Sequence, residues 1–331
     1  MHIIEDKSFD GENLSHYIQL TLGVFILCVS ETRSERGKQK NSAEHGKTEV
    51  IDLEQKMVFR TQEELNQWAE VPDKKLGDGV KIVQFEEGIQ KIPAKSFFNL
   101  PIYEVFLPSS VTEIEDYAFY GCEKLESVHW QKGLKHIGWY SFKKTGIREL
   151  LLPDGVTEVG YEAFAEMSNL VQVYLPDSIE KISSTFSNCP KLESIHLSNS
   201  IKILHAGTLE NAIELNELII PASVQIIDVD VAADSGVRRI VFQGSPQLIC
   251  RLNIKKYPNL GQLVFCSAPP AQDTDMMKEI EDGGLGIYGS NQCSLFYLNS
   301  FATEWAPNGE PEWNGFPLIG IDSLDELPPL E

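Results

Sequence analysis

No apolar run in the sequence is long enough to cross a membrane as a helix, which takes about 20 residues. The longest run extends from Ile18 to Val29 and is interrupted by polar residues and a glycine. Its alternating apolar residues favour a strand in a small N-terminal segment. An atypical export signal is the alternative, although the acidic residues before the run argue against one. We expect no membrane insertion, and both interpretations of the run stay open.

Basic residues are also few, with 28 Lys and Arg against 49 Asp and Glu, which gives a net charge of −21. An acidic surface repels phosphate groups, so nucleic acid is not an expected partner. Part of the scarce positive charge lies between Arg33 and Lys40, inside the polar stretch 31–48. Such a stretch buries too little apolar surface to order itself and is typical of a linker.

Cysteine is sparse as well: the six cysteines are irregularly spaced and include no C-x-x-C pair. This spacing indicates neither a zinc site nor a disulfide framework. We expect mostly free, buried thiols, which favours a reducing compartment or an organism that does not rely on disulfides.

Motifs of catalysis are missing: the sequence has no G-x-S-x-G elbow, no H-E-x-x-H pair and no P-loop. The stretch Gly284-x-Gly286-x-x-Gly289 matches the dinucleotide fingerprint in letters. That fingerprint needs a strand before it and a helix after it, and neither is indicated here. We therefore expect no enzyme, no cofactor and no metal site. An enzyme confined to residues 1–79 is the remaining alternative, and that stretch is poor in convergent polar residues.

The sequence does contain one short apolar pattern, repeated from about Ile102 to Phe265. A clear copy runs from Leu125 to Trp130 and follows the pattern L-x-x-V-x-W. Its apolar residues alternate with other residues, which predicts a short strand with one buried face. Equivalent positions recur every 22 or 23 residues, since 156 − 134 = 22 and 179 − 156 = 23. This period is typical of leucine-rich coils. The predicted fold class is a β-rich repeat solenoid, a right-handed coil of leucine-rich repeat units with capping segments.

A small residue followed by a large one closes each repeat. These pairs are Ala118-Phe119, Ser141-Phe142, Ala163-Phe164, Thr185-Phe186 and Thr208-Leu209. Rings at the same corner of successive coils would stack as an internal ladder. A single coil cannot exclude water from its own apolar residues, so stability must come from stacked neighbours and from caps at both ends.

The repeat resembles that of the BspA-like bacterial leucine-rich repeat family, whose pattern is approximately LxxLxLPxxLxxIxxxAFxxC. The most complete copy is Ile102-x-x-Val105-x-Leu107-Pro108-x-x-Val111-x-x-Ile114-x-x-x-Ala118-Phe119-x-x-Cys122. The match is tight over about half of the chain and weaker outward to Lys81 and Pro270. The resemblance implies surface recognition or adhesion without catalysis, and a cell-surface or secreted location. The lack of a convincing signal peptide instead favours the cytoplasm, so the compartment is left open.

Four parts of the chain follow from these patterns. Residues 1–48 form the N-terminal segment, with its strand or export signal and linker, and residues 49–79 form an N-terminal cap. A capping box from Thr61 to Glu64 predicts a short helix in that cap. Residues 80–270 form the solenoid. Residues 271–331 form a C-terminal cap and an acidic tail, with a strand at Phe296–Leu298 and a tail that we expect to be frayed from Ser323 onward.

The alternation also predicts which side chains leave the concave sheet. If Leu125, Val128 and Trp130 point inward, one central column points outward. We call this column the stripe: Phe106, His129, Leu151, Tyr174, His196, Ile219, Val241 and Val264. A mostly apolar row beside a polar, largely acidic one suits a protein partner with a basic surface.

Two other interpretations of the stripe are open. Apolar residues are favoured on any sheet face by cross-strand packing, or the N-terminal segment folds over them. A glycan is the alternative partner, held by the aromatic rings of Tyr174, Trp305 and Trp313.

Overall fold

The computed structural model describes most of the chain from residue 55 onward. The described ranges are 55–77, 79–228, 230–246, 248–249, 256–269, 293–306, 311–313 and 316–330. In the N-terminal segment it describes two short strands, β1 (Ile18–Gln19) and β2 (Phe25–Ile26), which pair antiparallel. The rest of that segment lies outside the described residues, so its strand and export interpretations both stay predictions. The segment 276–292, with its glycine fingerprint, lies outside them too.

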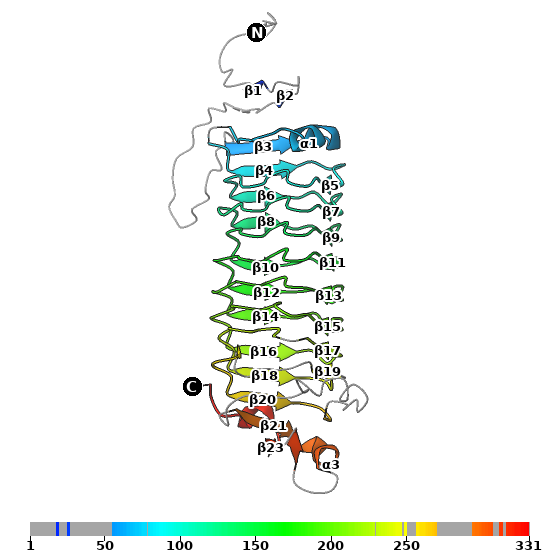
Figure 1. The fold of residues 1–331 in the computed structure, drawn as a ribbon. Coiled ribbons are helices and arrows are strands. Elements are labelled where there is room, and N and C mark those ends of the chain that lie inside the picture. The colour runs from blue at the N-terminus through cyan, green and yellow to red at the C-terminus, as the bar shows by residue number, and fades with distance from the viewer. Residues whose placement is uncertain are drawn as a thin grey trace, which may run out of the picture.

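Two stacks of parallel strands run along the molecule, and they form the predicted solenoid (Figure 1). We call the stack of longer strands the front sheet. Its parallel strands are β3 (Lys56–Phe59), β4 (Ile82–Phe85), β6 (Glu104–Phe106), β8 (Ser127–His129), β10 (Glu149–Leu151), β12 (Gln172–Tyr174), β14 (Ser194–His196), β16 (Glu217–Ile220), β18 (Arg239–Phe242), β20 (Gln262–Phe265), β21 (Ser294–Leu298) and β23 (Phe316–Ile321). A further strand, β22 (Glu312–Trp313), pairs antiparallel with β23.

The second stack, which we call the side sheet, consists of two-residue strands. They are β5 (Lys91–Ile92), β7 (Glu113–Ile114), β9 (His136–Ile137), β11 (Glu158–Val159), β13 (Lys181–Ile182), β15 (Ile203–Leu204), β17 (Ile226–Ile227) and β19 (Leu248–Ile249). From β4 to β19, each coil therefore contributes one strand to each sheet before the chain returns.

The repeat period sets the strand register. In the front sheet Leu150 lies beside Val173, and Val173 lies beside Ile195, which are steps of one repeat. Leu150 and Val173 are buried, whereas their strand neighbours Leu151 and Tyr174 face solvent. The predicted alternation of inward and outward residues is confirmed in these strands.

The predicted aromatic ladder is also confirmed. The rings of Phe97, Phe119, Phe142, Phe164 and Phe186 are fully buried and stacked. Successive ring centroids lie 5.2, 5.1, 5.5 and 5.9 Å apart. Fully burying such a side chain stabilises a fold by about 1.5–3 kcal/mol. The ladder therefore joins five successive coils through their largest core side chains.

A helix covers the N-terminal end of this stack. Helix α1 (Gln62–Ala69) begins as predicted after Thr61, whose Oγ1 accepts a hydrogen bond from the Glu64 backbone N–H at 3.1 Å. Leu65 and Trp68 on its inner face are buried. The Trp68 Nε1 donates to the Ser96 carbonyl at 2.8 Å. Helix α1 thereby covers apolar rings at the end of the stack that would otherwise be exposed to water.

Strand β21 confirms the strand predicted at Phe296–Leu298, and two short helical turns follow it, η3 (Asn299–Phe301) and α3 (Ala302–Trp305). The Trp305 ring is buried, with its centroid 5.0 Å from that of Phe265, and its Nε1 donates to the Ser267 carbonyl at 2.9 Å. Within the described part of the chain, every helix is too short or too polar to cross a membrane.

Candidate functional site

The first six members of the stripe form a row on the outer face of the front sheet. Strand pairing places Phe106 beside His129, and it places Tyr174 between Leu151 and His196. The exposed fractions of Leu151, Tyr174 and Ile219 are 55%, 46% and 42%. We call Phe106, His129, Leu151, Tyr174, His196 and Ile219 the open stripe. Large apolar side chains with this exposure in one row are a candidate contact surface.

Ring contacts hold two pairs of side chains in this row. The His129 ring stacks on Phe106 with centroids 3.9 Å apart, and its Nε2 lies 2.6 Å from the Glu104 Oε1. Further along, the Tyr174 and His196 rings stack with centroids 4.5 Å apart. Side chains already held by neighbours lose little freedom when a partner binds, which lowers the cost of association.

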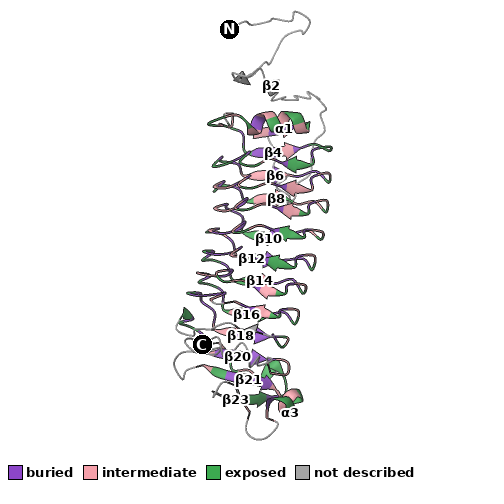
Figure 2. Cartoon of the chain, turned by 45° about the vertical axis from the view of Figure 1, so that its right-hand side comes forward, coloured by how far each residue is buried: buried purple, intermediate pink, exposed green. Residues whose placement is uncertain are grey.

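The last two members of the stripe are not exposed, so the expectation of a solvent-facing row is wrong for Val241 and Val264. Both are buried in a small second core with Phe296 and Ile321. Leu327 packs against that core, next to the short helix η4 (Leu324–Glu326). Figure 2 shows the change from exposed residues in β10 and β12 to buried ones in β18 and β20.

The cover over this end is the C-terminal tail, residues 322–330, which we call the strap. Its Pro328 carbonyl accepts hydrogen bonds from Arg239 Nη2 at 2.7 Å and Gln262 Nε2 at 3.1 Å. Arg239 also donates to Glu217 Oε1 at 3.1 Å and to Gln262 Oε1 at 2.7 Å. The tail was expected to fray, and these contacts show that it is docked. The physical reason is that the strap shields apolar side chains that the repeat pattern leaves on the outer face.

Two of the three aromatic residues proposed for glycan stacking, Tyr174 and Trp305, do not come together. Tyr174 lies in β12 at the middle of the front sheet, whereas Trp305 lies in the C-terminal helix α3. The indole of Trp305 is buried and presents no free face. The Trp313 side chain lies outside the described residues.

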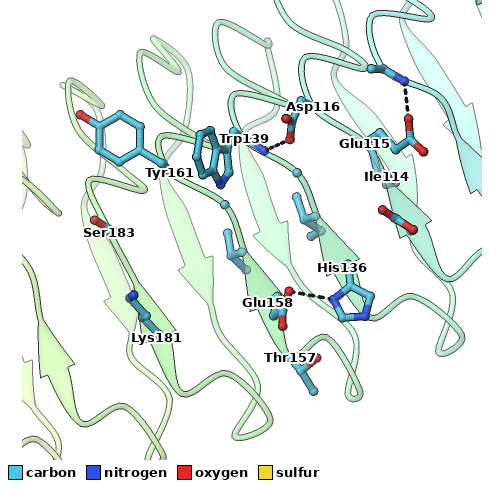
Figure 3. Close-up of a pocket in the computed structure, with 16 residues that line it drawn as sticks. Ile114, Glu115, Asp116, His136, Trp139, Thr157, Glu158, Tyr161, Lys181 and Ser183 are labelled. Atoms are coloured by element: carbon cyan, nitrogen blue, oxygen red, sulfur yellow. Dashed lines mark hydrogen bonds and ion pairs between the residues drawn. The ribbon is translucent and has the colours of Figure 1, made fainter.

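A groove that the sequence analysis missed crosses the side sheet (Figure 3). Its volume is about 860 Å³, and its lining comes from the loops and strands around β7, β9, β11 and β13. Trp139 and Tyr161 line it, and their exposed fractions are 59% and 40%. The signal in the sequence is a pair of glycines, Gly138 and Gly160, one repeat apart and each followed by an aromatic residue.

Carboxylates dominate the charge of this groove. Glu113 pairs with Lys91 at 2.6 Å, and Glu158 lies 3.1 Å from the His136 Nδ1. The other charged residues of its lining are Glu115, Asp116 and Lys181. Over the residues that the structure describes, no group of three side chains is arranged to hold a metal ion.

The described cysteines are Cys122, Cys189, Cys266 and Cys293, and all four are free thiols. Burial raises the pKa of the Cys122 and Cys189 thiols to about 12. Since the thiolate is the nucleophile, these two side chains are core residues and not reactive groups. Cys28 and Cys250 lie outside the described residues.

The repeat is recognised by a family model. Residues 78–170 and 135–252 match the BspA type Leucine rich repeat region in six copies, so the match covers more than half of the 331 residues. No curated protein matches the sequence.

Several solved structures are similar. A leucine-rich repeat protein from Bacteroides ovatus shares 24% identity over 66% of this chain, with a TM-score of 0.45. The chain spans only 63% of that protein's length. The T. pallidum Leucine Rich Repeat protein shares 20% identity over 71% of this chain and 93% of its own, with a TM-score of 0.39. The pneumococcal vaccine antigen PcpA shares 15% identity over 81% and 80%, with a TM-score of 0.39.

Proposed function

Because the chain belongs to the BspA-type leucine-rich repeat family, a family of generally non-enzymatic repeat scaffolds, we propose that it binds a protein partner through the open stripe. The observation that carries this proposal is the exposure of Leu151, Tyr174 and Ile219 in one row of the front sheet. Binding would remove these apolar surfaces from water, at about 25 cal/mol per Å² of apolar area. No catalytic step is part of the proposed function.

The border of the open stripe suggests the chemistry of the partner. Glu104, Glu149 and Glu217 line it in β6, β10 and β16. An apolar centre with an acidic border complements a partner that has an apolar ridge and a basic rim. The charged border would speed association and select the partner, whereas the apolar centre would supply most of the affinity.

The test uses the double variant Leu151→Asp, Ile219→Asp, which places two charges in the row without touching the core. The matched control is Ile213→Asp, because Ile213 is 53% exposed and lies away from the front sheet strands. All three proteins are used for affinity capture from lysate and surface extract of the source cell, with circular dichroism to verify folding.

We expect a protein that is held by wild type and by Ile213→Asp, and that the double variant loses. Equal capture by all three proteins would contradict the proposal. Unfolding of the double variant would also count against it, because these side chains would then belong to the core.

A further inference from the structure

We propose that the groove at Trp139 is a second binding site, which takes an extended peptide segment carrying arginine or lysine. The groove lies on the side sheet, and the open stripe lies on the front sheet, so the two sites can be tested separately. The proposal does not depend on the function proposed for the stripe.

Two coils stack closely at the floor of the groove because Gly138 and Gly160 have no side chain. A Cβ at Gly138 would lie 2.6 Å from the Asp116 backbone nitrogen, and a Cβ at Gly160 would lie 2.6 Å from Trp139 Cδ1. Only glycine therefore allows these coils to stack closely and the indole to extend across the next coil. The result is a shallow channel with the indole beside it (Figure 3).

The backbone that carries the indole is held in place, although most of the Trp139 side chain is exposed. Asp116 Oδ1 accepts a hydrogen bond from the Trp139 backbone N–H at 2.7 Å, and the Trp139 carbonyl accepts one from Tyr117 at 2.9 Å. An exposed tryptophan gives up the apolar burial that this residue type normally gains on folding. Because the backbone at Trp139 is fixed before binding, a ligand has less of the site to order.

The charges around the indole favour a cation. Glu115, Asp116 and Glu158 line the groove together with Lys181, and Glu113, which also lines it, is already paired with Lys91. Glu115 accepts a hydrogen bond from the Ala94 N–H at 3.0 Å, which keeps its carboxylate at the groove. A guanidinium or ammonium group over an indole is attracted by the negative face of the ring. Neighbouring carboxylates add charge-assisted hydrogen bonds.

The dimensions suit a short extended segment. The groove crosses the coils of β7, β9, β11 and β13. Strands in a sheet lie about 4.8 Å apart, so these four span about 14 Å. An extended chain rises about 3.3 Å per residue, so this length takes about four residues. One basic side chain could then lie over Trp139 while the backbone passes across the glycine floor.

The experiment measures fluorescence anisotropy of a labelled Gly-Arg-Ala-Arg-Gly peptide with the full chain in 0.15 M salt. A second peptide with citrulline in place of arginine keeps the shape and removes the charge. The variants are Trp139→Ala, and Glu158→Gln with its charge-matched control Glu193→Gln. Because the chain carries a net charge of −21, the uncharged Trp139→Ala change separates a built site from general attraction of a cation.

We expect the arginine peptide to bind wild type and Glu193→Gln alike. Binding should fall at least tenfold in Trp139→Ala, several-fold in Glu158→Gln, and at least tenfold for the citrulline peptide. Equal binding of both peptides would overturn the proposal, as would unchanged binding in folded Trp139→Ala or equal losses in the two glutamine variants. Lack of peptide binding, together with binding of a neutral oligosaccharide such as maltotriose that depends on Trp139, would replace the proposed ligand by a glycan.

Discussion

Replacing Arg239 with glutamine removes the charged donor that binds the strap to the front sheet. In this variant the strap no longer receives the hydrogen bond that Arg239 Nη2 donates to the Pro328 carbonyl at 2.7 Å. The bonds of Arg239 to Glu217 and Gln262 lie within the sheet and do not include an atom of the strap. Hydrogen bonds that involve a charged group contribute about 1.5–3 kcal/mol. The open fraction of the strap should therefore rise about 10- to 150-fold, since 1.4 kcal/mol corresponds to a factor of ten.

Cys266 reports this opening, because it packs against the core beneath the strap and burial raises the pKa of its thiol. The assay is the rate of alkylation of each cysteine in the folded protein, followed by peptide mass spectrometry. Cys122 is fully buried in the main core and reports global unfolding. We expect faster alkylation of Cys266 in Arg239→Gln, with Cys122 unchanged.

The matched control is Arg238→Gln, which removes the same charge one residue away. If Cys266 reacts at the wild-type rate in Arg239→Gln, the strap does not depend on this hydrogen bond and the reasoning is refuted. If the alkylation of Cys122 accelerates equally, the variant is unfolding as a whole, which also contradicts a local role of Arg239 at the strap.

Two further predictions concern stability. Phe142→Ala opens a cavity in the middle of the ladder and should lower the free energy of unfolding by about 3–5 kcal/mol in urea titrations. Phe98→Ala at the surface should lower it far less. Similar losses of stability in the two variants would contradict the ladder's role. Hydrogen bonding to Lys143 lowers the pKa of the Glu166 carboxyl, so its contribution is complete above the ordinary glutamate pKa of about 4.3 and is lost as pH falls through the lowered folded value. The urea midpoint should thus fall between about pH 5 and 3 more in wild type than in Glu166→Gln, and parallel curves would contradict this linkage.

Most of the solenoid could be predicted because its information is local and repeated. One alternating run per coil determines that Leu150 and Val173 are buried and that Leu151 and Tyr174 face outward. The small-large pairs predicted the ring ladder for the same reason, since identical corners must stack. The capping box predicted the start of α1 at Thr61, because this signal lies within four residues.

The features that escaped prediction are those that break the repeat. The strap, which covers Val241 and Val264, is a distant segment outside the repeats. No property of the individual coils therefore reveals that these two residues are buried. Trp305 lies in a similar non-repeating segment, where an aromatic side chain can be buried or exposed. The groove at Trp139 depends on glycines in two neighbouring coils, and it becomes visible only when equivalent glycine positions are compared between coils.

The strap also changes how the folding of this chain should be organised. Side-chain contacts between neighbouring coils typically join residues about 21 to 25 positions apart, as in Ser110–Ile89 and Cys122–Phe97. The strap contacts of Arg239 and Gln262 with Pro328 join residues 89 and 66 positions apart. An array of local contacts can nucleate anywhere and unravel from either end. By joining β18 and β20 to the segment that follows β23, the strap raises the local contact order and makes these coils open as one cooperative unit.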